Sequence, residues 1–340
     1  MLVLGIDTSC DDCAVAIVKD GQTILSSVIA SQNEAHAEFQ GVVPEIASRL
    51  HTEHIVPVYR QALEEAGVEE SSLEAVAVTA RPGLVGSLLV GLSFAKALAF
   101  SRHLPLWGVD HILAHLYAVQ LESPISYPHL GLLVSGGHTI LAKVTNFDQL
   151  EVLGTTVDDA VGEAFDKVAK FLGLGYPGGK AVDTLAQSGQ AEAFRFPRPQ
   201  LKPGRRPYDL SFSGLKTAVI HQRESFLNPG FDNSLPNICA SFQKTVVDML
   251  ISLVKRAAQE TGISTVVLAG GVASNSSLRK EFAQTTSLKV YYPSLPLCTD
   301  NGAMVAGLAY HHLLRGDRST WSLNAESRVP HFKAFSHTKP

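Results

Sequence analysis

Short apolar runs alternate with longer amphipathic stretches along most of the chain, and this pattern predicts strands followed by helices. Near the start, the runs Leu2–Asp7, Ala14–Lys19 and Thr23–Ala30 have the length of strands. Asp20-Gly21, between the last two, is typical of a hairpin turn. A helix is expected over Glu45–Ala66, because a proline precedes it and a glycine follows it. The chain therefore begins with a three-stranded meander and a long helix.

The first half of the chain continues with two more strands and two more helices. Strands are predicted at Ala75–Thr79 and Leu104–Val109, with a helix over Val85–Phe100 between them. A helical pattern that carries His111 and His115 follows directly.

The second half repeats this order with one long insert. Its expected strands are Leu130–Val134, Thr139–Val144, Gln149–Thr156, Thr265–Ala269 and Lys289–Tyr292. Its expected helices are Pro236–Glu260, Asn275–Ala283 and Asn301–Leu314. The insert, residues 157–235, holds an amphipathic helix at Val161–Leu172, a glycine-rich turn at Gly175–Gly179 and an irregular stretch rich in proline and arginine.

Two copies of the same element order predict an α/β fold made of two similar domains that face each other across a cleft. We expect the first domain at residues 1–125, the second at 126–320 and an irregular tail at 321–340. The helix of His111 and the helix that opens at Asn301 are counterparts, since each follows the last strand of its half. Ligands of such sheets bind at the carboxyl ends of the strands.

Composition narrows the class of protein. With 340 residues, 45% hydrophobic and 18% charged, the chain suits two globular domains. No apolar run has membrane-spanning length, and the first residues lack a signal peptide, so a cytoplasmic location is expected. Four cysteines do not make a disulfide framework in a chain of this length. Because the net charge is −4, binding to nucleic acid would need a local basic patch or helper proteins.

His111 and His115 are one helical turn apart, so both side chains can bind the same metal ion. Asp300 is the candidate third ligand, because the repeat places it at the equivalent strand end. Capping or packing of the histidines is the alternative interpretation. A metalloprotease helix is not favoured, since H-E-x-x-H requires glutamate where Ile112 stands.

Two turns at equivalent points of the repeat have the composition of phosphate loops. The first contains Asp7 and Ser9, where hydroxyls and backbone N–H groups can hold phosphate and the carboxylate can hold a cation. The second consists of Val134, Ser135, Gly136, Gly137 and His138, and its glycines allow close approach to the backbone. Ordinary hairpin turns are the alternative for either turn alone.

These motifs together resemble a known family. Within the actin, sugar kinase and heat-shock ATPase (ASKHA) superfamily, the chain is similar to the tRNA threonylcarbamoyladenosine transferases, called TsaD in bacteria and once described as sialoglycoprotein endopeptidases. The resemblance extends from Leu4 to about Leu314. The strings that carry it are GIDTSCD, GVVPEIASRLH, HILAH, LVSGGHT, GEAFDKVAKFLGLGYPGG, LSFSGLKT, LAGGVASN and CTDNGAM.

The resemblance implies transfer of a threonylcarbamoyl group from threonylcarbamoyl-AMP to N6 of the adenine next to the anticodon on its 3′ side. The tRNAs concerned read codons that start with adenine, and AMP leaves. The implied metal is Fe²⁺, with Zn²⁺ as the alternative, on His111, His115 and Asp300, and Mg²⁺ can accompany the nucleotide. Implied partners are tRNA, a TsaB-like paralogue, a TsaE-like ATPase and a separate synthase for the donor, with no membrane.

The resemblance also implies roles for single residues. Asp11 is the candidate catalytic residue, which would orient or deprotonate the acceptor amine. The nucleoside would be held by Asp166, Gly179, Asp183 and Asn275. The chain departs from the family pattern at Asp12, Cys13 and Arg81. Cys10 and Cys13 form a C-x-x-C pair, but the adjacent carboxylates are expected to raise the thiol pKa and lower its reactivity.

The insert supplies the candidate tRNA contacts. Its basic side chains, interleaved with aromatic residues, are suited to phosphates and unpaired bases. They are Arg195, Arg198, Lys202, Arg205 and Arg206. A solvated basic loop is the alternative.

Three other functions remain to be compared with the transferase. An ATP-dependent small-molecule kinase of the same fold would have no use for the histidine pair. A non-catalytic scaffold subunit would be expected to have lost the metal ligands. A metallo-endopeptidase would need the glutamate that Ile112 replaces.

Overall fold

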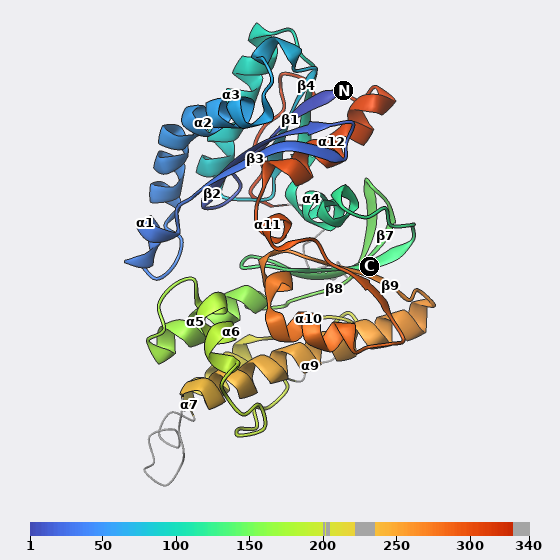
Figure 1. Ribbon diagram of the computed structural model, residues 1–340. Coiled ribbons are helices and arrows are strands. Elements are labelled where there is room, and N and C mark those ends of the chain that lie inside the picture. The colour runs from blue at the N-terminus through green and yellow to red at the C-terminus, as the bar shows by residue number, and fades with distance from the viewer. Residues whose placement is uncertain (200, 202–204, 222–234, 329–340) are drawn as a thin grey trace, which may run out of the picture. The chain divides into compact units, whose positions relative to one another are not determined.

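The computed structural model describes residues 1–199, 201, 205–221 and 235–328 (Figure 1). Contacts within the chain divide it into two compact units. The first unit is Met1–Ser126 together with the chain from Pro293 onward, and the second unit is Tyr127–Tyr292. The first segment of the first unit thus ends one residue after the boundary expected at residue 125. The segment 293–320, expected in the second domain, instead groups with the first unit, because its main helix packs on the first sheet.

The first unit contains a five-stranded sheet in the order β3-β2-β1-β4-β5. Its strands are β1 (Leu2–Asp7), β2 (Asp12–Lys19), β3 (Thr23–Ser31), β4 (Ala75–Arg81) and β5 (Leu106–Asp110). The first three strands form an antiparallel meander, and β4 and β5 run parallel to β1. The carboxyl ends of β1, β4 and β5 therefore meet at one edge of the sheet.

Helices cover both faces of this sheet. The helices of the first unit are α1 (Asn33–Ala37), α2 (Pro44–Ala66), α3 (Val85–Ser101), α4 (His111–Tyr117), α11 (Leu295–Cys298) and α12 (Gly302–Arg315), with short 3-10 turns at Glu70–Ser72 and Ala118–Leu121. Helix α2 packs on β2 and β3, α3 packs on β4, and α12 packs on β1 and β2. Figure 1 shows α12 on the face opposite α2.

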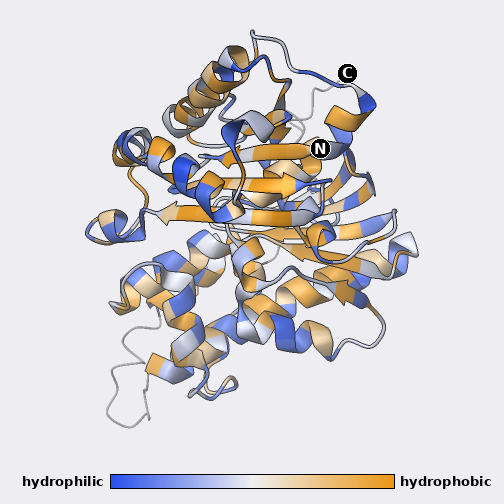
Figure 2. Ribbon diagram, turned by 45° about the horizontal axis from the view of Figure 1, so that its top comes forward, coloured by the Kyte–Doolittle hydropathy of each residue, from blue (hydrophilic) through white to orange (hydrophobic). Residues whose placement is uncertain are grey.

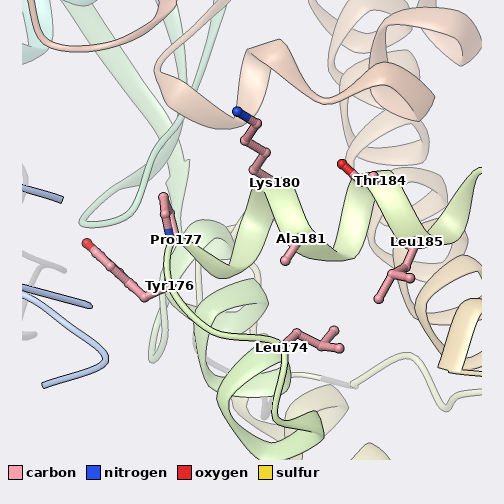
Figure 3. Close-up of a pocket in the computed structure, with 7 residues that line it drawn as sticks. All are labelled: Leu174, Tyr176, Pro177, Lys180, Ala181, Thr184 and Leu185. Carbon is pink, nitrogen blue, oxygen red and sulfur yellow. The ribbon is translucent and has the colours of Figure 1, made fainter. Parts of the chain in front are cut away.

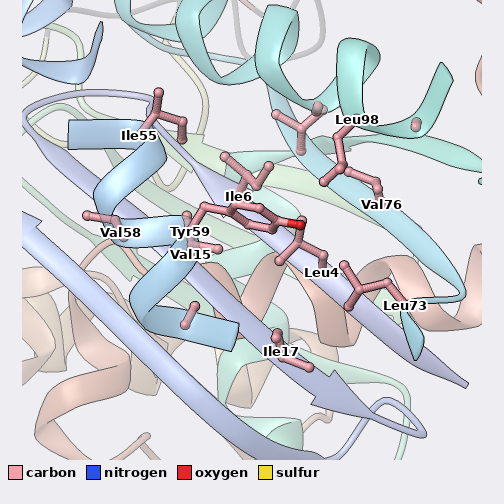
Figure 4. Close-up of a cluster of buried hydrophobic side chains, with 14 of the residues drawn as sticks. Leu4, Ile6, Val15, Ile17, Ile55, Val58, Tyr59, Leu73, Val76 and Leu98 are labelled. Carbon is pink, nitrogen blue, oxygen red and sulfur yellow. The ribbon is translucent and has the colours of Figure 1, made fainter. Parts of the chain in front are cut away.

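The hydrophobic core of the first unit lies between the sheet and helices α2 and α3 (Figure 4). Leu4 and Ile6 alternate along β1 and meet Tyr59 of α2 and Leu98 of α3 in one buried cluster. Because side chains of a strand alternate between faces, Gly5 points to the other side, where α12 lies. Hydrophobic residues are concentrated along the strands of this sheet (Figure 2).

Two glycines allow α12 to approach β1 closely. A Cβ atom on Gly5 would lie 2.1 Å from the carbonyl oxygen of Gly302, and one on Gly302 would lie 2.5 Å from the carbonyl oxygen of Gly5. A larger residue at either position would push the helix away from the strand. This contact fixes the start of α12, and Asp300 is two residues before it.

The second unit has the same sheet order, β8-β7-β6-β9-β10. Its strands are β6 (His129–Val134), β7 (Thr139–Asn146), β8 (Gln149–Thr155), β9 (Thr265–Ala269) and β10 (Lys289–Tyr291). Its described helices are α5 (Val161–Leu172), α6 (Gly178–Ala186), α7 (Ser213–His221), α9 (Leu235–Thr261) and α10 (Ser276–Ala283), with a 3-10 turn at Gly271–Ser274. The predicted duplication is therefore confirmed.

The strands predicted from the sequence agree with the structure to within two residues at each end. Helices α6 and α7 were missed. The glycine pair at the start of α6 was interpreted as a turn, whereas the Asp166 carboxylate accepts hydrogen bonds from Gly178 N and Gly179 N and stabilises the first turn of the helix. Among the described residues, no helix combines the length and apolar character needed to cross a bilayer.

Residues 321–340 were expected as an irregular tail, and the described part of the chain after α12 lies against the first sheet. Residues 317–326, which we call the C-terminal strap, lie along strand β5, where Ser319 N donates to Leu106 O at 2.8 Å. Leu323 and Ala325 pack against the core cluster. The strap is thus an ordered component of the first unit.

Candidate metal centre and phosphate loop

The two histidines are presented by the short helix that follows β5. Asp110 ends the strand and caps this helix, since its carboxylate accepts from Ile112 N at 3.0 Å and from Leu113 N at 3.3 Å. His111 and His115 lie one turn apart in α4, and their ring centroids are 4.5 Å apart. Both side chains are buried.

Asp300 completes the cluster from the turn before α12. Its Oδ1 atom lies 3.1 Å from His115 Nε2 and 3.6 Å from His111 Nε2. One ligand atom from each of the three residues can be chosen so that all lie within 4.8 Å of one another. Two imidazoles and one carboxylate suit a divalent transition metal and leave coordination positions for a substrate. The predicted association of Asp300 with the two histidines is confirmed.

Asp7 supports this cluster from the end of β1. Its Oδ2 atom lies 3.0 Å from His111 Nδ1 and accepts from Thr79 Oγ1 at 2.6 Å, while Oδ1 accepts from Ser9 N at 2.9 Å. When Nδ1–H of His111 donates to this carboxylate, the Nε2 lone pair faces Asp300 and is available to a metal. Asp7 was expected to bind phosphate or a cation, and the structure places its fully buried carboxylate against His111, a candidate metal ligand.

Ser9 also lies in the cluster. Its hydroxyl is 3.3 Å from both His111 Nδ1 and Asp300 Oδ2. The sequence did not indicate Thr79 as a member of this group, and its only signal was a hydroxyl near the carboxyl end of a buried strand. The turn between β1 and β2 is therefore part of the candidate metal centre.

The charges in this cluster shift its pKa values. Burial lowers the pKa of His111, but the carboxylates of Asp7 and Asp300 outweigh this effect and raise it to about 9. Burial acts to raise the pKa of Asp300, whereas His111 and His115 hold it well below its usual range. The pKa of His115 is lowered by burial and by the neighbouring charge of His111. Without metal, protonated His111 thus attracts the carboxylates of Asp7 and Asp300.

The predicted catalytic Asp11 lies in the same β1–β2 turn. Burial and the nearby charge of Asp300 raise its pKa, although a hydrogen bond with Cys10 opposes the change. Burial, followed by Asp300 and Asp11, raises the pKa of Asp12 to about 7. A carboxyl group with a raised pKa is a better proton acceptor near neutral pH than an ordinary surface aspartate.

The pKa values of both thiols of the C-x-x-C pair are raised. Burial, with Asp11 and Asp300 next, raises the pKa of Cys10 well above its usual range, and burial with Asp7 and Asp12 raises that of Cys13 to about 12. Both cysteines are free. The expected direction is confirmed, with burial as the larger cause.

In the second unit, the loop Val134–His138 joins β6 to β7. The Ser135 N–H donates to His138 O at 2.8 Å, and the His138 N–H donates to Ser135 Oγ at 3.0 Å, so the loop is closed by its own groups. A Cβ atom on Gly136 or Gly137 would meet no atom within 4 Å. The loop therefore exposes bare backbone, as an anion site requires.

A series of contacts connects this loop with the helices that carry the residues predicted to bind the nucleoside. Gly162 N at the start of α5 donates to Ser135 O at 3.1 Å, and Asp166 on the same helix accepts from Gly178 N and Gly179 N at the start of α6. One turn further along α6, Asp183 accepts from Ser276 N and Ser276 Oγ. A Cβ atom on Gly270 would lie 2.5 Å from Val134 O, so the backbone at Gly270 lies against the start of the same loop.

Asn275 belongs to the same region, but it is buried. Its Oδ1 atom caps α10 by accepting from Leu278 N at 2.9 Å, and its Nδ2 donates to Gln243 Oε1 at 2.8 Å. The structure thus brings Asp166, Gly179, Asp183 and Asn275 together around one group of helix starts, and gives each polar side chain a capping contact.

An open hollow of about 400 Å³ lies along α6. Figure 3 shows that its walls come from α6 and from the loop before it, with Tyr176 and Leu174 on that loop. Lys180, Thr184 and Tyr176 carry its polar side-chain groups, and the remaining lining is apolar. The hollow adjoins the Gly178–Gly179 start of the helix.

The basic residues of the insert are less available than their pattern indicated. Arg198 forms an ion pair with Asp248 at 3.1 Å, and Arg206 donates to Val152 O at 3.4 Å. Arg195 and Arg205 are exposed, and Lys202 lies outside the described residues. Two of the interleaved aromatic rings, Phe196 and Tyr208, are buried, so they cannot stack on bases.

The duplicated α/β fold is of the ASKHA type, and it carries a His–His–Asp cluster as a candidate metal centre and a separate glycine loop. Component A of (R)-2-hydroxyglutaryl-CoA dehydratase from Acidaminococcus fermentans has the same fold, with a TM-score of 0.57 at 17% identity over 92% of this chain and 99% of that chain.

The particular family is given by the sequence matches. Residues 23–307 match the family model of TsaD, tRNA N6-adenosine threonylcarbamoyltransferase. The proteins of that name from Treponema denticola and Borreliella afzelii are 54% and 50% identical over 98% of this chain, and the matches cover 98% and 96% of the two relatives. The chain belongs to the tRNA N6-adenosine threonylcarbamoyltransferase family and is a transferase of tRNA modification. The kinase alternative is not favoured.

Proposed function

We propose that this enzyme transfers the threonylcarbamoyl group of threonylcarbamoyl-AMP to N6 of the adenine on the 3′ side of the anticodon, in tRNAs that read codons starting with adenine. The N6 amine forms a bond to the carbamoyl carbon, the bond between that carbon and the phosphate oxygen breaks, and AMP leaves. The observation that carries the proposal is the buried His111–His115–Asp300 cluster in a chain of this family.

His111, His115 and Asp300 would hold one divalent ion, for which Fe²⁺ is proposed and Zn²⁺ is the alternative. The donor set fits, because Asp7 orients His111 and leaves its Nε2 atom facing Asp300. When bound, the ion supplies Lewis-acid polarisation of the donor. Asp11 is proposed to accept the proton that the amine loses, since burial has already raised its pKa.

The second unit is proposed to bind the nucleotide. The bare backbone of Gly136 and Gly137 suits a phosphate, with Mg²⁺ as an accompanying ion. The carboxylates of Asp166 and Asp183 are proposed to accept hydrogen bonds from ribose hydroxyls, since an ionised carboxylate has several acceptor positions. Gly179 and Asn275 are proposed to lie against the nucleoside.

The proposed tRNA contacts are Arg195 and Arg205, whose side chains are exposed, with Arg198 and Arg206 able to contribute only by leaving their present partners. The family resemblance further leads us to propose a TsaB-like paralogue, a TsaE-like ATPase and a separate donor synthase as partners. We place the reaction in the cytoplasm, where the tRNA substrate is found.

Reconstituted transfer tests the proposal. The purified protein is mixed with threonylcarbamoyl-AMP, the proposed partner subunits and unmodified tRNA, and the digested nucleosides are analysed by mass spectrometry. We expect threonylcarbamoyl-adenosine with the unaltered protein and none with Asp300→Ala. Absence of product with all partners present, together with phosphate transfer from ATP to a small metabolite, would support the kinase instead.

A further inference from the structure

The C-terminal strap, residues 317–326, occupies the free edge of strand β5. Among the described strands it is the last in its sheet, so one side of its backbone has no neighbouring strand there. Ser319 N donates to Leu106 O at 2.8 Å, and Gly108 N donates to Ser319 Oγ at 2.9 Å. Ser319 therefore satisfies the backbone groups of β5 that a sixth strand would otherwise bind.

The strap is also anchored by its side chains and carbonyl groups. A Cβ atom on Gly108 would lie 2.7 Å from a methyl carbon of Leu323, so this leucine packs directly over the middle of β5. Lys96 Nζ donates to Trp321 O at 2.9 Å, and the Trp321 ring packs edge-to-face on Phe100, with centroids 5.6 Å apart. These contacts fix the strap on the strand and on α3.

At its far end the strap reaches the residues that support the metal helix. Glu326 N donates to Ala80 O at 2.9 Å, and this carbonyl lies at the irregularity between Thr79 and Arg81 where β4 and β5 lose register. Arg81 lies between two carboxylates, 3.6 Å from Glu326 and 3.4 Å from Asp110. Asp110 is the cap of α4, so the strap is two contacts away from His111.

We propose that the strap is a positioning element for the metal centre, which holds β5 and the Asp110 cap so that His111 and His115 keep their spacing. Helix α4 has only seven residues and depends on its cap and its packing rather than on its own stability. An edge strand without a neighbour frays more readily than a paired one. This inference rests on the proposed metal site.

Full-length point variants test the proposal. Ser319→Pro removes the N–H and the hydroxyl that bind β5, Ser319→Ala removes only the hydroxyl, and Leu323→Ala removes the packing over Gly108. Ser322→Ala is the matched control, because it makes the same change as Ser319→Ala in the same segment, and the Ser322 hydroxyl contacts Thr320 Oγ1 rather than β5.

Two measurements are made on each variant. The first is the Zn²⁺ affinity in competition with a chelator, and the second is amide hydrogen exchange of Ile112–Leu116 in the metal-free protein. We expect Ser319→Pro to weaken Zn²⁺ binding by about tenfold and to speed exchange in α4, with smaller changes for Ser319→Ala and Leu323→Ala and none for Ser322→Ala. Exchange in β6 of the second unit should be unchanged and reports an intact fold.

The proposal would be overturned if Leu323→Ala and Ser319→Ala both keep the amide hydrogen exchange and the Zn²⁺ affinity of the unaltered protein. This outcome decides the question even if Ser319→Pro does not fold. A further arm uses Gly108→Ala, whose new methyl group would press on Leu323. In the double variant Gly108→Ala/Leu323→Ala, α4 should regain part of the protection from hydrogen exchange that Gly108→Ala alone removes. If the unaltered protein binds no Zn²⁺ or Fe²⁺, the proposed metal centre fails, whereas the exchange data still decide whether the strap supports α4.

Discussion

The Nδ1 atom of His111 lies 3.0 Å from the Oδ2 atom of Asp7, a residue 104 positions earlier in the chain. Asp7 itself is fixed by hydrogen bonds from Thr79 Oγ1 and Ser9 N. Its carboxylate therefore holds the His111 imidazole in one orientation through the Nδ1 side of the ring. A carboxylate in this position also makes the metal-facing nitrogen a stronger ligand. Asp7 therefore acts through His111.

Replacement of Asp7 by asparagine should weaken metal binding by about 10- to 100-fold, because the neutral amide no longer orients and polarises His111. Metal titration against a chelator measures the change. Asp20→Asn, in the exposed turn before β3, is the control and should bind metal normally. An unchanged affinity in Asp7→Asn would show that the Asp7–His111 contact has no role in the metal centre.

Metal binding should depend on pH through His111. In the metal-free protein its pKa is raised to about 9, so at pH 7 the ring carries a proton that a metal must displace. The apparent affinity should rise by about tenfold per pH unit from pH 7 and level off near pH 9. Calorimetry in two buffers of different ionisation enthalpy should detect about one proton released per metal at pH 7. Asp7→Asn should move the plateau to lower pH.

Asp11→Asn should lower kcat for transfer by about 10²- to 10⁴-fold, since the amide cannot accept a proton. Metal affinity should stay close to that of the unaltered protein, because Asp11 is not among the cluster's ligands. Single-turnover transfer and Zn²⁺ titration of the same preparation separate the two effects. Full activity in Asp11→Asn would remove this residue from the mechanism.

Gly5→Ala should destabilise the first unit. The new Cβ atom would lie 2.1 Å from Gly302 O and 2.6 Å from Ala306 N, and backbone atoms cannot move aside as a side chain does. We expect a loss of about 1–3 kcal/mol in the free energy of unfolding, with weaker metal binding because Asp300 moves with α12. Urea unfolding measures the first effect and metal titration the second.

Gly137→Ala, unlike Gly5→Ala, should leave the stability unchanged and weaken nucleotide binding. A Cβ atom there would meet no protein atom within 4 Å, so the unfolding midpoint should not change. The methyl group would instead occupy the space that a phosphate needs, and AMP binding should weaken by about tenfold. Calorimetric titration with AMP checks the result, and normal AMP affinity would argue against this loop as the phosphate site.

Much of this fold could be predicted because its strands are apolar and bounded by turn residues. The duplicated order also indicated that His111, His115 and Asp300 belong together. The assignment of α12 to the first unit was harder to predict, since the period of hydrophobicity does not show that this helix returns to the first sheet. That return depends on the contact of Gly5 with Gly302, two small residues whose effect appears only when strand and helix meet.

The roles of Asp7 and of residues 178–186 were harder to predict for a related reason. A carboxylate at a strand end is equally suited to phosphate, a cation or a histidine, and only the position of α4 decides among them. Gly178 and Gly179 favour a turn locally, and the distant Asp166 provides the cap that makes them the start of a helix. Tertiary contacts thus overrode the local pattern at both positions.

The distance of Asp300 from His115, 185 residues along the chain, has a consequence during biosynthesis. Strands β1–β5 and both histidines leave the ribosome early, but the helix that covers the second face of their sheet is among the last segments made. Until then that face of β1 and β2 is uncovered, and the cluster has two ligands of three. Loading of the proposed metal centre would therefore follow completion of the chain, and a product that stops before α12 would neither bury its first sheet nor assemble all three candidate ligands.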